Sequence, residues 1–325
     1  MKNGLDTWST AKIFIAGEIH GVKENSQVKF DLIEYLVNNN GVRKIVLELG
    51  FFDSMALNKY LQTGNEKILH SMINNYPCTY AFSKNEIIFW QRLYKYNARL
   101  EKSKKLTVVG VDCNGKVDSI YKYILFLLRK QELFSKKDSR TLLNTIQVFK
   151  KNIKENAAEG AEKTEEKVYQ LLNGYSERKS EAYVFFKNLV DELFAHGNML
   201  LYPDKRKEIR ENYICQKILE EYSKIPSEGK IFGQFGVLHV SSDITNKNAA
   251  VEKIIEKIHQ KCVRILYSYR KCIYYVVEDG KVQFRDLEQS IIANGNMVFE
   301  MPISVQYTAF GSNESDCFYI RVNGT

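Results

Sequence analysis

A glutamate and a histidine stand two positions apart in the stretch Gly17-Glu18-Ile19-His20-Gly21, directly after a short apolar run. In extended backbone, side chains two residues apart point to the same side, so the carboxylate of Glu18 and the imidazole of His20 are expected to lie together. A histidine oriented by a carboxylate is a common general base for proton transfer. The plainer interpretation is an ion pair at a surface turn.

Three more polar residues mark the ends of apolar runs. Glu48 lies near the end of the second run, Asp112 ends the third and His239 follows the fourth. The carboxyl ends of parallel strands meet at one edge of a sheet, where open α/β sheets bind their ligands. We therefore expect these residues to join the first pair there, although an acid at a strand end can also cap a helix and a lone histidine can be structural. The four runs span residues 12–16, 44–49, 106–112 and 230–236.

A charged helix over residues 205–215 adds one more group. Its apolar face contains Ile209, Tyr213 and Ile214, and Arg210 borders that face. An arginine in this position can point into a cleft and present its planar fork to a carboxylate or an oxyanion. The alternative is an ordinary exposed charge on a helix.

The elements that must position these residues alternate between strands and helices in the first third of the chain. This alternation predicts an α/β fold with a central, mostly parallel sheet flanked by helices and joined by right-handed crossovers. From about residue 117 to 222 only helical periodicity is found, and the last fifty residues are rich in strand patterns with a turn at 278–280. We expect residues 1–116 to form the first part of the core, 117–225 a helical insertion or cap, and 226–325 the rest of the core with edge strands.

Composition narrows the class of protein. The net charge of +8 comes from small, scattered basic groups without interleaved aromatic residues, so nucleic acid is not expected as a partner. The six cysteines form no CxxC pair, and no signal peptide is visible, which together predict a cytoplasmic protein. No apolar run approaches the roughly 18 residues of a membrane span, so no membrane partner is expected. The long helical middle offers a surface for a homodimer.

Taken in order, these motifs resemble the erythromycin esterase-like superfamily, which also includes the ChaN-like haem-binding lipoproteins and the Tiki/TraB-type metalloproteases. The resemblance spans about residues 12–240. Its motifs are Gly17-Glu18-Ile19-His20-Gly21, Glu48, Gly110-Val111-Asp112, Arg210-Glu211-Asn212-Tyr213-Ile214-Cys215 and Gly236-Val237-Leu238-His239-Val240.

The chain departs from the esterases at two of these motifs. One residue, rather than the usual two, separates Glu18 from His20, a spacing closer to the ChaN-like branch. Ile214-Cys215 also replaces the usual Met-Ala pair. The glycine after His20, the Arg210 helix and the long helical middle favour the esterase branch.

The resemblance implies hydrolysis of an ester or lactone in a small-molecule substrate. His20 would activate water as a general base, and Glu18 or Glu48 would orient its ring. Arg210 and His239 would stabilise the oxyanion or protonate the leaving oxygen.

Asp112 would hold a partner side chain rather than react. No serine or cysteine sits in a nucleophile elbow, so no covalent acyl-enzyme is expected, and Cys113 is interpreted as structural. No cofactor is expected in this scheme.

Two other classes of function use the same residues. Two histidines and two carboxylates can hold Mn²⁺ or Zn²⁺ with an open position for water, which would make the protein a metal-dependent hydrolase or protease. The cleft can instead bind haem or another ligand without catalysis, although the lipidated cysteine of the haem-binding lipoproteins is absent near residue 1. An effector that uses the fold for an interaction is a third alternative.

Overall fold

The computed structural model describes residues 8–75, 84–114, 117–176, 180–225, 229–240, 249–258, 262–270, 272–278, 281–287, 297–300, 308–311 and 317–323. The chain divides into two compact units. The first unit comprises Met1–Glu48, Ser54–Val109 and Cys215–Thr325, and the second comprises Leu49–Asp53 and Gly110–Ile214.

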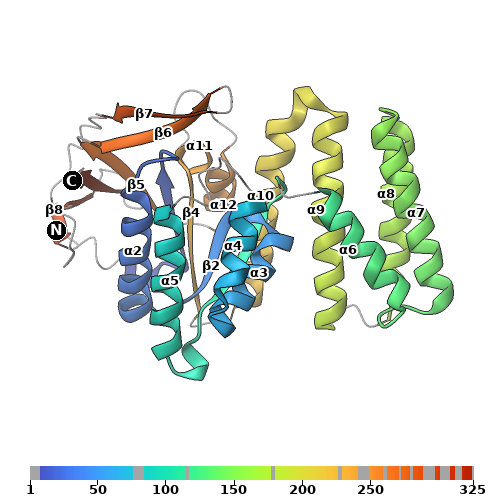
Figure 1. Cartoon of the computed structure of the whole chain (residues 1–325), viewed down its shortest axis with the longest axis horizontal. Coiled ribbons are helices and arrows are strands. Elements are labelled where there is room, and N and C mark those ends of the chain that lie inside the picture. The colour runs from blue at the N-terminus through green and yellow to red at the C-terminus, as the bar shows by residue number, and fades with distance from the viewer. Residues whose placement is uncertain are drawn as a thin grey trace. The chain divides into compact units, whose positions relative to one another are not determined.

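The first unit is built on an eight-stranded sheet of order β3-β2-β4-β1-β5-β10-β9-β8. Strands β2, β4 and β5 of this sheet are labelled in Figure 1. Strand β1 runs parallel to β4 and β5, and the parallel pairing continues from β4 to β2 and from β5 to β10. Strands β9 and β8 extend the edge in antiparallel pairing. The predicted α/β fold with a central, mostly parallel sheet is confirmed. The strands are β1 (Ile13–Glu18), β2 (Val42–Gly50), β3 (Thr107–Asp112), β4 (Lys230–Gly236), β5 (Cys262–Arg270), β8 (Met297–Glu300), β9 (Thr308–Gly311) and β10 (Cys317–Asn323).

Two strands depart from the predicted edge arrangement. Strands β6 (Cys272–Glu278) and β7 (Lys281–Leu287) form a separate antiparallel pair, so the prediction that they extend the parallel core was wrong. The reason is that β1 and β10 already occupy both sides of β5, which leaves the strand that follows β5 no place beside it. A turn was predicted at residues 278–280, and residues 279–280 lie outside the described residues.

Helices cover this sheet because its central strands are apolar on both faces. Every residue of Ile13–Ala16 in β1 is fully buried, as expected for a strand packed from two sides. Helix α2 buries Val28 and Leu32 and ends at Asn40, and the next residue, Gly41, closes the last turn with a left-handed φ of 77°. The helices are α2 (Asn25–Asn40), α3 (Phe51–Thr63), α4 (Glu66–Asn75), α5 (Lys84–Arg99), α11 (Val237–Val240) and α12 (Ala250–Ile258), with a short 3₁₀ helix at Lys102–Lys104.

The second unit contains the helical middle of the chain. Serine caps begin two of its helices: the hydroxyl of Ser135 accepts from the backbone N–H of Asp138, and that of Ser180 accepts from the N–H of Tyr183. Its helices are α6 (Val117–Lys130), α7 (Lys136–Lys154), α8 (Ala158–Asn173), α9 (Glu181–Leu201) and the part of α10 (Arg206–Lys224) up to Ile214, with a 3₁₀ turn at Pro203–Lys205. Over the described residues, no helix has the length and apolar composition to cross a membrane.

Candidate functional site

The ends of three neighbouring strands place four of the predicted residues at one edge of the sheet in the first unit. Glu18 ends β1 and lies opposite Gly236, the last residue of β4. Directly after Gly236 the polypeptide continues into the short helix α11, which contains His239. Glu48 follows Leu47 of β2, which is paired with the other side of β4. Strand β4 therefore lies between the strand that carries Glu48 and the strand that carries Glu18.

These four side chains form a continuous polar chain. Nδ1 of His20 lies 3.0 Å from Oε1 of Glu18, and its Nε2 lies 3.4 Å from Oε2 of Glu48. The other oxygen of Glu48 lies 3.3 Å from Nε2 of His239. The backbone N–H of Gly236 also donates to Glu48, at 2.7 Å. We call the set Glu18, His20, Glu48 and His239 the carboxylate–histidine chain.

The side chains of the carboxylate–histidine chain differ in solvent exposure, and His20 carries a positive charge. The side chain of His20 is 37% exposed, whereas that of His239 is only 8% exposed, so His20 is the member that an incoming molecule can reach. Burial alone would lower the pKa of His20, but hydrogen bonds to Glu18 and Glu48 raise it to about 10. Burial would likewise raise the pKa of Glu48, but the two imidazoles hold it well below its usual range. At neutral pH His20 is therefore an imidazolium between two carboxylates, and it must lose a proton before it can act as a base.

The contact between His20 and Glu48 depends on the glycine that ends β4. A Cβ atom added to Gly236 would lie 2.6 Å from Nε2 of His20 and 3.3 Å from its Cε1. Real Cβ atoms do not approach ring atoms this closely, so any larger residue would displace the imidazole. Because Gly236 has no side chain, His20, which follows β1, and Glu48 of β2 can meet beside it, although β1 and β2 are not neighbours in the sheet.

We expect Gly236→Ala to move the ring of His20 away from Glu48 and to lower the pKa of His20 below that of the unchanged protein. The reason is that Glu48 is one of the two carboxylates that favour the charged ring. An NMR titration of the histidine ring protons measures this pKa. A titration curve identical to that of the unchanged protein would contradict the inferred clash.

Residues that the sequence did not single out hold the backbone between Glu18 and His20. The N–H of Ile19 donates to the hydroxyl oxygen of Tyr269 at 3.1 Å, and the amide of Asn25 donates to the carbonyl of Ile19 at 2.7 Å. The hydroxyl of Tyr269 in turn donates to Asn25 at 2.8 Å. Asn25 begins α2 and Tyr269 lies in β5, so no local pattern of the sequence links them to the segment between Glu18 and His20.

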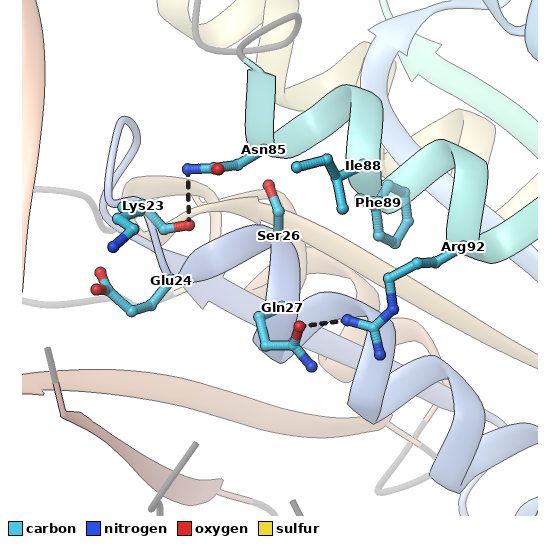
Figure 2. A pocket seen from close by; sticks show the side chains of 8 residues that line it. All are labelled: Lys23, Glu24, Ser26, Gln27, Asn85, Ile88, Phe89 and Arg92. Atoms are coloured by element: carbon cyan, nitrogen blue, oxygen red, sulfur yellow. Dashed lines mark hydrogen bonds between the residues drawn. The ribbon is translucent and has the colours of Figure 1, made fainter. Parts of the chain in front are cut away.

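A pocket of about 250 Å³ lies where the start of α2 meets α5 (Figure 2), and its first lining residues follow His20 in the sequence. Ile88 and Phe89 give it apolar lining, and the amide of Asn85 donates to the backbone carbonyl of Lys23 at 3.4 Å. Lys23 follows His20 by three residues, so their Cα atoms can be at most about 11 Å apart. None of the residues that line the pocket belongs to the carboxylate–histidine chain.

The remaining two predicted residues form a pair inside the second unit. Nε and Nη2 of Arg210 donate to the two oxygens of Asp112 at 3.0 and 2.7 Å. Asp112 is almost completely buried and also accepts from the N–H of Cys113 at 2.7 Å. A bidentate pair of this kind fixes the plane of the guanidinium. The structure thus brings the six predicted residues together as two groups, one in each unit.

The thiol next to this pair lies in apolar surroundings. Cys113 is fully buried and packs against Met199 and Tyr213. Burial raises the pKa of the Cys113 thiol far above its ordinary value, so the reactive thiolate is not formed near neutral pH. This environment agrees with a structural role. Among the residues that the structure describes, no three histidine, cysteine, aspartate or glutamate side chains are arranged to hold a metal ion.

Comparison with solved structures tests the predicted resemblance. A histidine-to-asparagine mutant of the erythromycin esterase EreC, in its open conformation, superposes with a TM-score of 0.68 at 15% sequence identity, covering 98% of this chain and 91% of the esterase. The predicted resemblance in fold to the erythromycin esterases is confirmed. No protein-family model matches the sequence, and no curated protein matches it.

Two further solved structures are similar to this chain in fold. A Bacillus cereus protein gives a TM-score of 0.71 at 16% identity, covering 98% of this chain and 90% of its own. A succinoglycan biosynthesis protein gives 0.70 at 17% identity, covering 98% and 89%. At 15–17% identity, similarity to these structures shows the fold alone, and the chemistry of this protein depends on its own side chains.

Proposed function

We propose that the protein is a hydrolase that cleaves an ester or lactone with His20 as the proton-transferring group. The observation that carries the proposal is the carboxylate–histidine chain, in which the accessible member is a histidine held from both sides. The fold shared with an erythromycin esterase supports the same class of reaction. A macrolide or a smaller lactone is therefore the first substrate class to examine.

In the proposed reaction the neutral form of His20 takes a proton from a water molecule at Nε2 while the water oxygen bonds to the carbonyl carbon. Glu18, at Nδ1, stabilises the imidazolium that forms. The tetrahedral intermediate then expels the alcohol oxygen, which receives the proton from Nε2, and the histidine returns to its neutral form. Oε2 of Glu48 lies 3.4 Å from the same Nε2, and the other oxygen of Glu48 contacts His239, so the water has to enter between Nε2 and Glu48. The assignment of Arg210 and His239 to the oxyanion stays a prediction.

The test is a hydrolysis assay on a macrolide, a simple lactone and an aryl ester, with His20→Gln as the background and with a chelator in a parallel series. Hydrolysis that exceeds this background and persists with chelator supports the proposal. Activity that disappears with chelator would favour the metal-dependent alternative. No hydrolysis above the background on any substrate would contradict the proposal, and a Soret band after mixing with haem would then favour ligand binding.

The raised pKa of His20 predicts an alkaline pH profile. The reactive form is the neutral ring, and with a pKa of about 10 it makes up about one molecule in a thousand at pH 7. Raising the pH converts imidazolium into imidazole, so kcat/KM is expected to rise about tenfold per pH unit from pH 7 to 9 and to level off near 10. The His20→Gln rate is subtracted at each pH to remove hydroxide catalysis. A flat profile between pH 7 and 9 would show that the neutral form of His20 is not the base.

A further inference from the structure

A buried glutamine lies behind Glu18 on the side away from His20. The amide nitrogen of Gln234 donates to Oε2 of Glu18, while Oε1 of Glu18 faces Nδ1 of His20. The amide oxygen of Gln234 accepts from the hydroxyl of Tyr267 at 2.8 Å. Gln234 and Tyr267 are both buried in the sheet, at 6% and 2% exposure. The four groups make one directed series from Tyr267 to His20.

The topology of the sheet explains how this series forms. Gln234 lies in β4 and Tyr267 in β5, and β1 runs between them. Two strands separated by a third are about 10 Å apart, which only long side chains can bridge. Ala16 of β1 is paired directly with Gln234, and its short side chain leaves the face above β1 open for that bridge. Glu18, two residues further along β1, points to the same face.

The direction of the hydrogen bonds follows from the chemistry of each group. The carboxylate of Glu18 only accepts hydrogen bonds, so the amide of Gln234 must turn its NH₂ group toward it, and the hydroxyl of Tyr267 then donates its one hydrogen to Oε1 of Gln234. If the amide were reversed, its oxygen would face the carboxylate, and two acceptors would meet. Burial raises the pKa of Tyr267 well above its ordinary value, so it stays a donor at working pH. Glu18 therefore sets the orientation of Gln234, Tyr267 supports that orientation by donating to the amide oxygen, and Gln234 in turn holds the carboxylate of Glu18 in place.

We propose that Gln234, supported by Tyr267, is a positioning residue that holds Glu18 against Nδ1 of His20. The inference rests on the proposed function for its effect on catalysis. Its effect on the protonation of His20 is independent of any substrate. A carboxylate held by one partner only can rotate away from the ring, and the imidazolium then loses a stabilising charge.

The test compares Gln234→Leu and Tyr267→Phe with Tyr60→Phe. The control removes another buried tyrosine hydroxyl of the same unit, which bonds Glu66 at 3.1 Å and contacts no member of the carboxylate–histidine chain. In Gln234→Leu we expect the pKa of His20 to fall below that of the unchanged protein. On the alkaline plateau, where His20 is neutral in both proteins, we expect kcat to fall about tenfold with KM unchanged. Tyr267→Phe is expected to move both quantities in the same direction by a smaller amount, and Tyr60→Phe to move neither.

The titration of His20 by NMR separates two kinds of failure. An unchanged His20 pKa in Gln234→Leu overturns the positioning role, whatever the activity. A lowered pKa in a protein without any hydrolase activity supports the positioning role and counts against the proposed function instead. If Gln234→Leu does not fold, Tyr267→Phe, which removes a single oxygen atom, carries the same comparison. A Tyr267→Phe protein with the pKa and kcat of Tyr60→Phe then overturns the proposal.

Discussion

Replacing His20 with glutamine is expected to lower kcat/KM for ester or lactone hydrolysis by about 100-fold or more. General acid–base groups contribute about 10²–10⁴-fold to a reaction, and glutamine cannot take up the proton that the attacking water releases. Glutamine is similar in size and still offers hydrogen bonds to the carboxylates on both sides of the ring. The measurement is the steady-state rate on the best substrate of the panel.

A matched control distinguishes this loss from a general effect of removing a histidine. His70 lies exposed on α4, and His70→Gln is expected to keep the activity of the unchanged protein. His70→Gln should unfold at the same denaturant concentration as the unchanged protein, because it changes an exposed surface position. His20→Gln removes the cation between Glu18 and Glu48, so it is expected to unfold at a lower concentration but still in one cooperative transition. Full activity in His20→Gln would end the assignment of His20 as the proton-transferring group.

Replacing Gly110 with alanine is expected to destabilise the protein by about 3 kcal/mol or more. An added Cβ would lie 2.1 Å from the carbonyl oxygen of Gly50 and 2.4 Å from that of Leu49. These atoms belong to the backbone of β2, so they cannot move aside as the end of a flexible side chain would. The free energy of unfolding, measured by chemical denaturation, checks the expectation.

The control for Gly110→Ala is a glycine without close neighbours. Gly174, at the end of α8, has a φ of −76°, and an added Cβ would meet nothing closer than 3.5 Å. Gly174→Ala is expected to be neutral or slightly stabilising, since alanine lowers the entropy of the unfolded chain. Equal stability of the two variants would show that β2 and β3 do not approach each other as closely as described.

Part of the site was predictable from local patterns. The spacing of Glu18 and His20 after an apolar run predicted their contact, because the two-residue period of a strand is a property of the chain itself. Alternating strands and helices predicted a parallel sheet, which brings strand ends to one edge. That argument also selected Glu48 and His239, which the structure places in the same polar chain.

Other parts of the site depended on which strands became neighbours. Gln234 and Tyr267 are 33 residues apart in the sequence. They meet because β4 and β5 lie on either side of β1, and their long side chains bridge it. The requirement for glycine at position 236 likewise follows from His20 and Glu48 meeting at the end of β4. Residue types and spacing contain no direct information on strand order, so neither contact could be argued from them.

The sequence by itself determined the α/β fold, the strand ends that carry polar residues and the pairing of Glu18 with His20. These follow from short-range periodicity and from the general rule that parallel strands end together. Only the tertiary structure decided the charge on His20. The sequence predicted a general base oriented by Glu18 or Glu48, whereas the folded chain places the ring between both carboxylates and raises its pKa to about 10. The physical reason is that electrostatic interactions depend on distances across the sheet, which strand order sets.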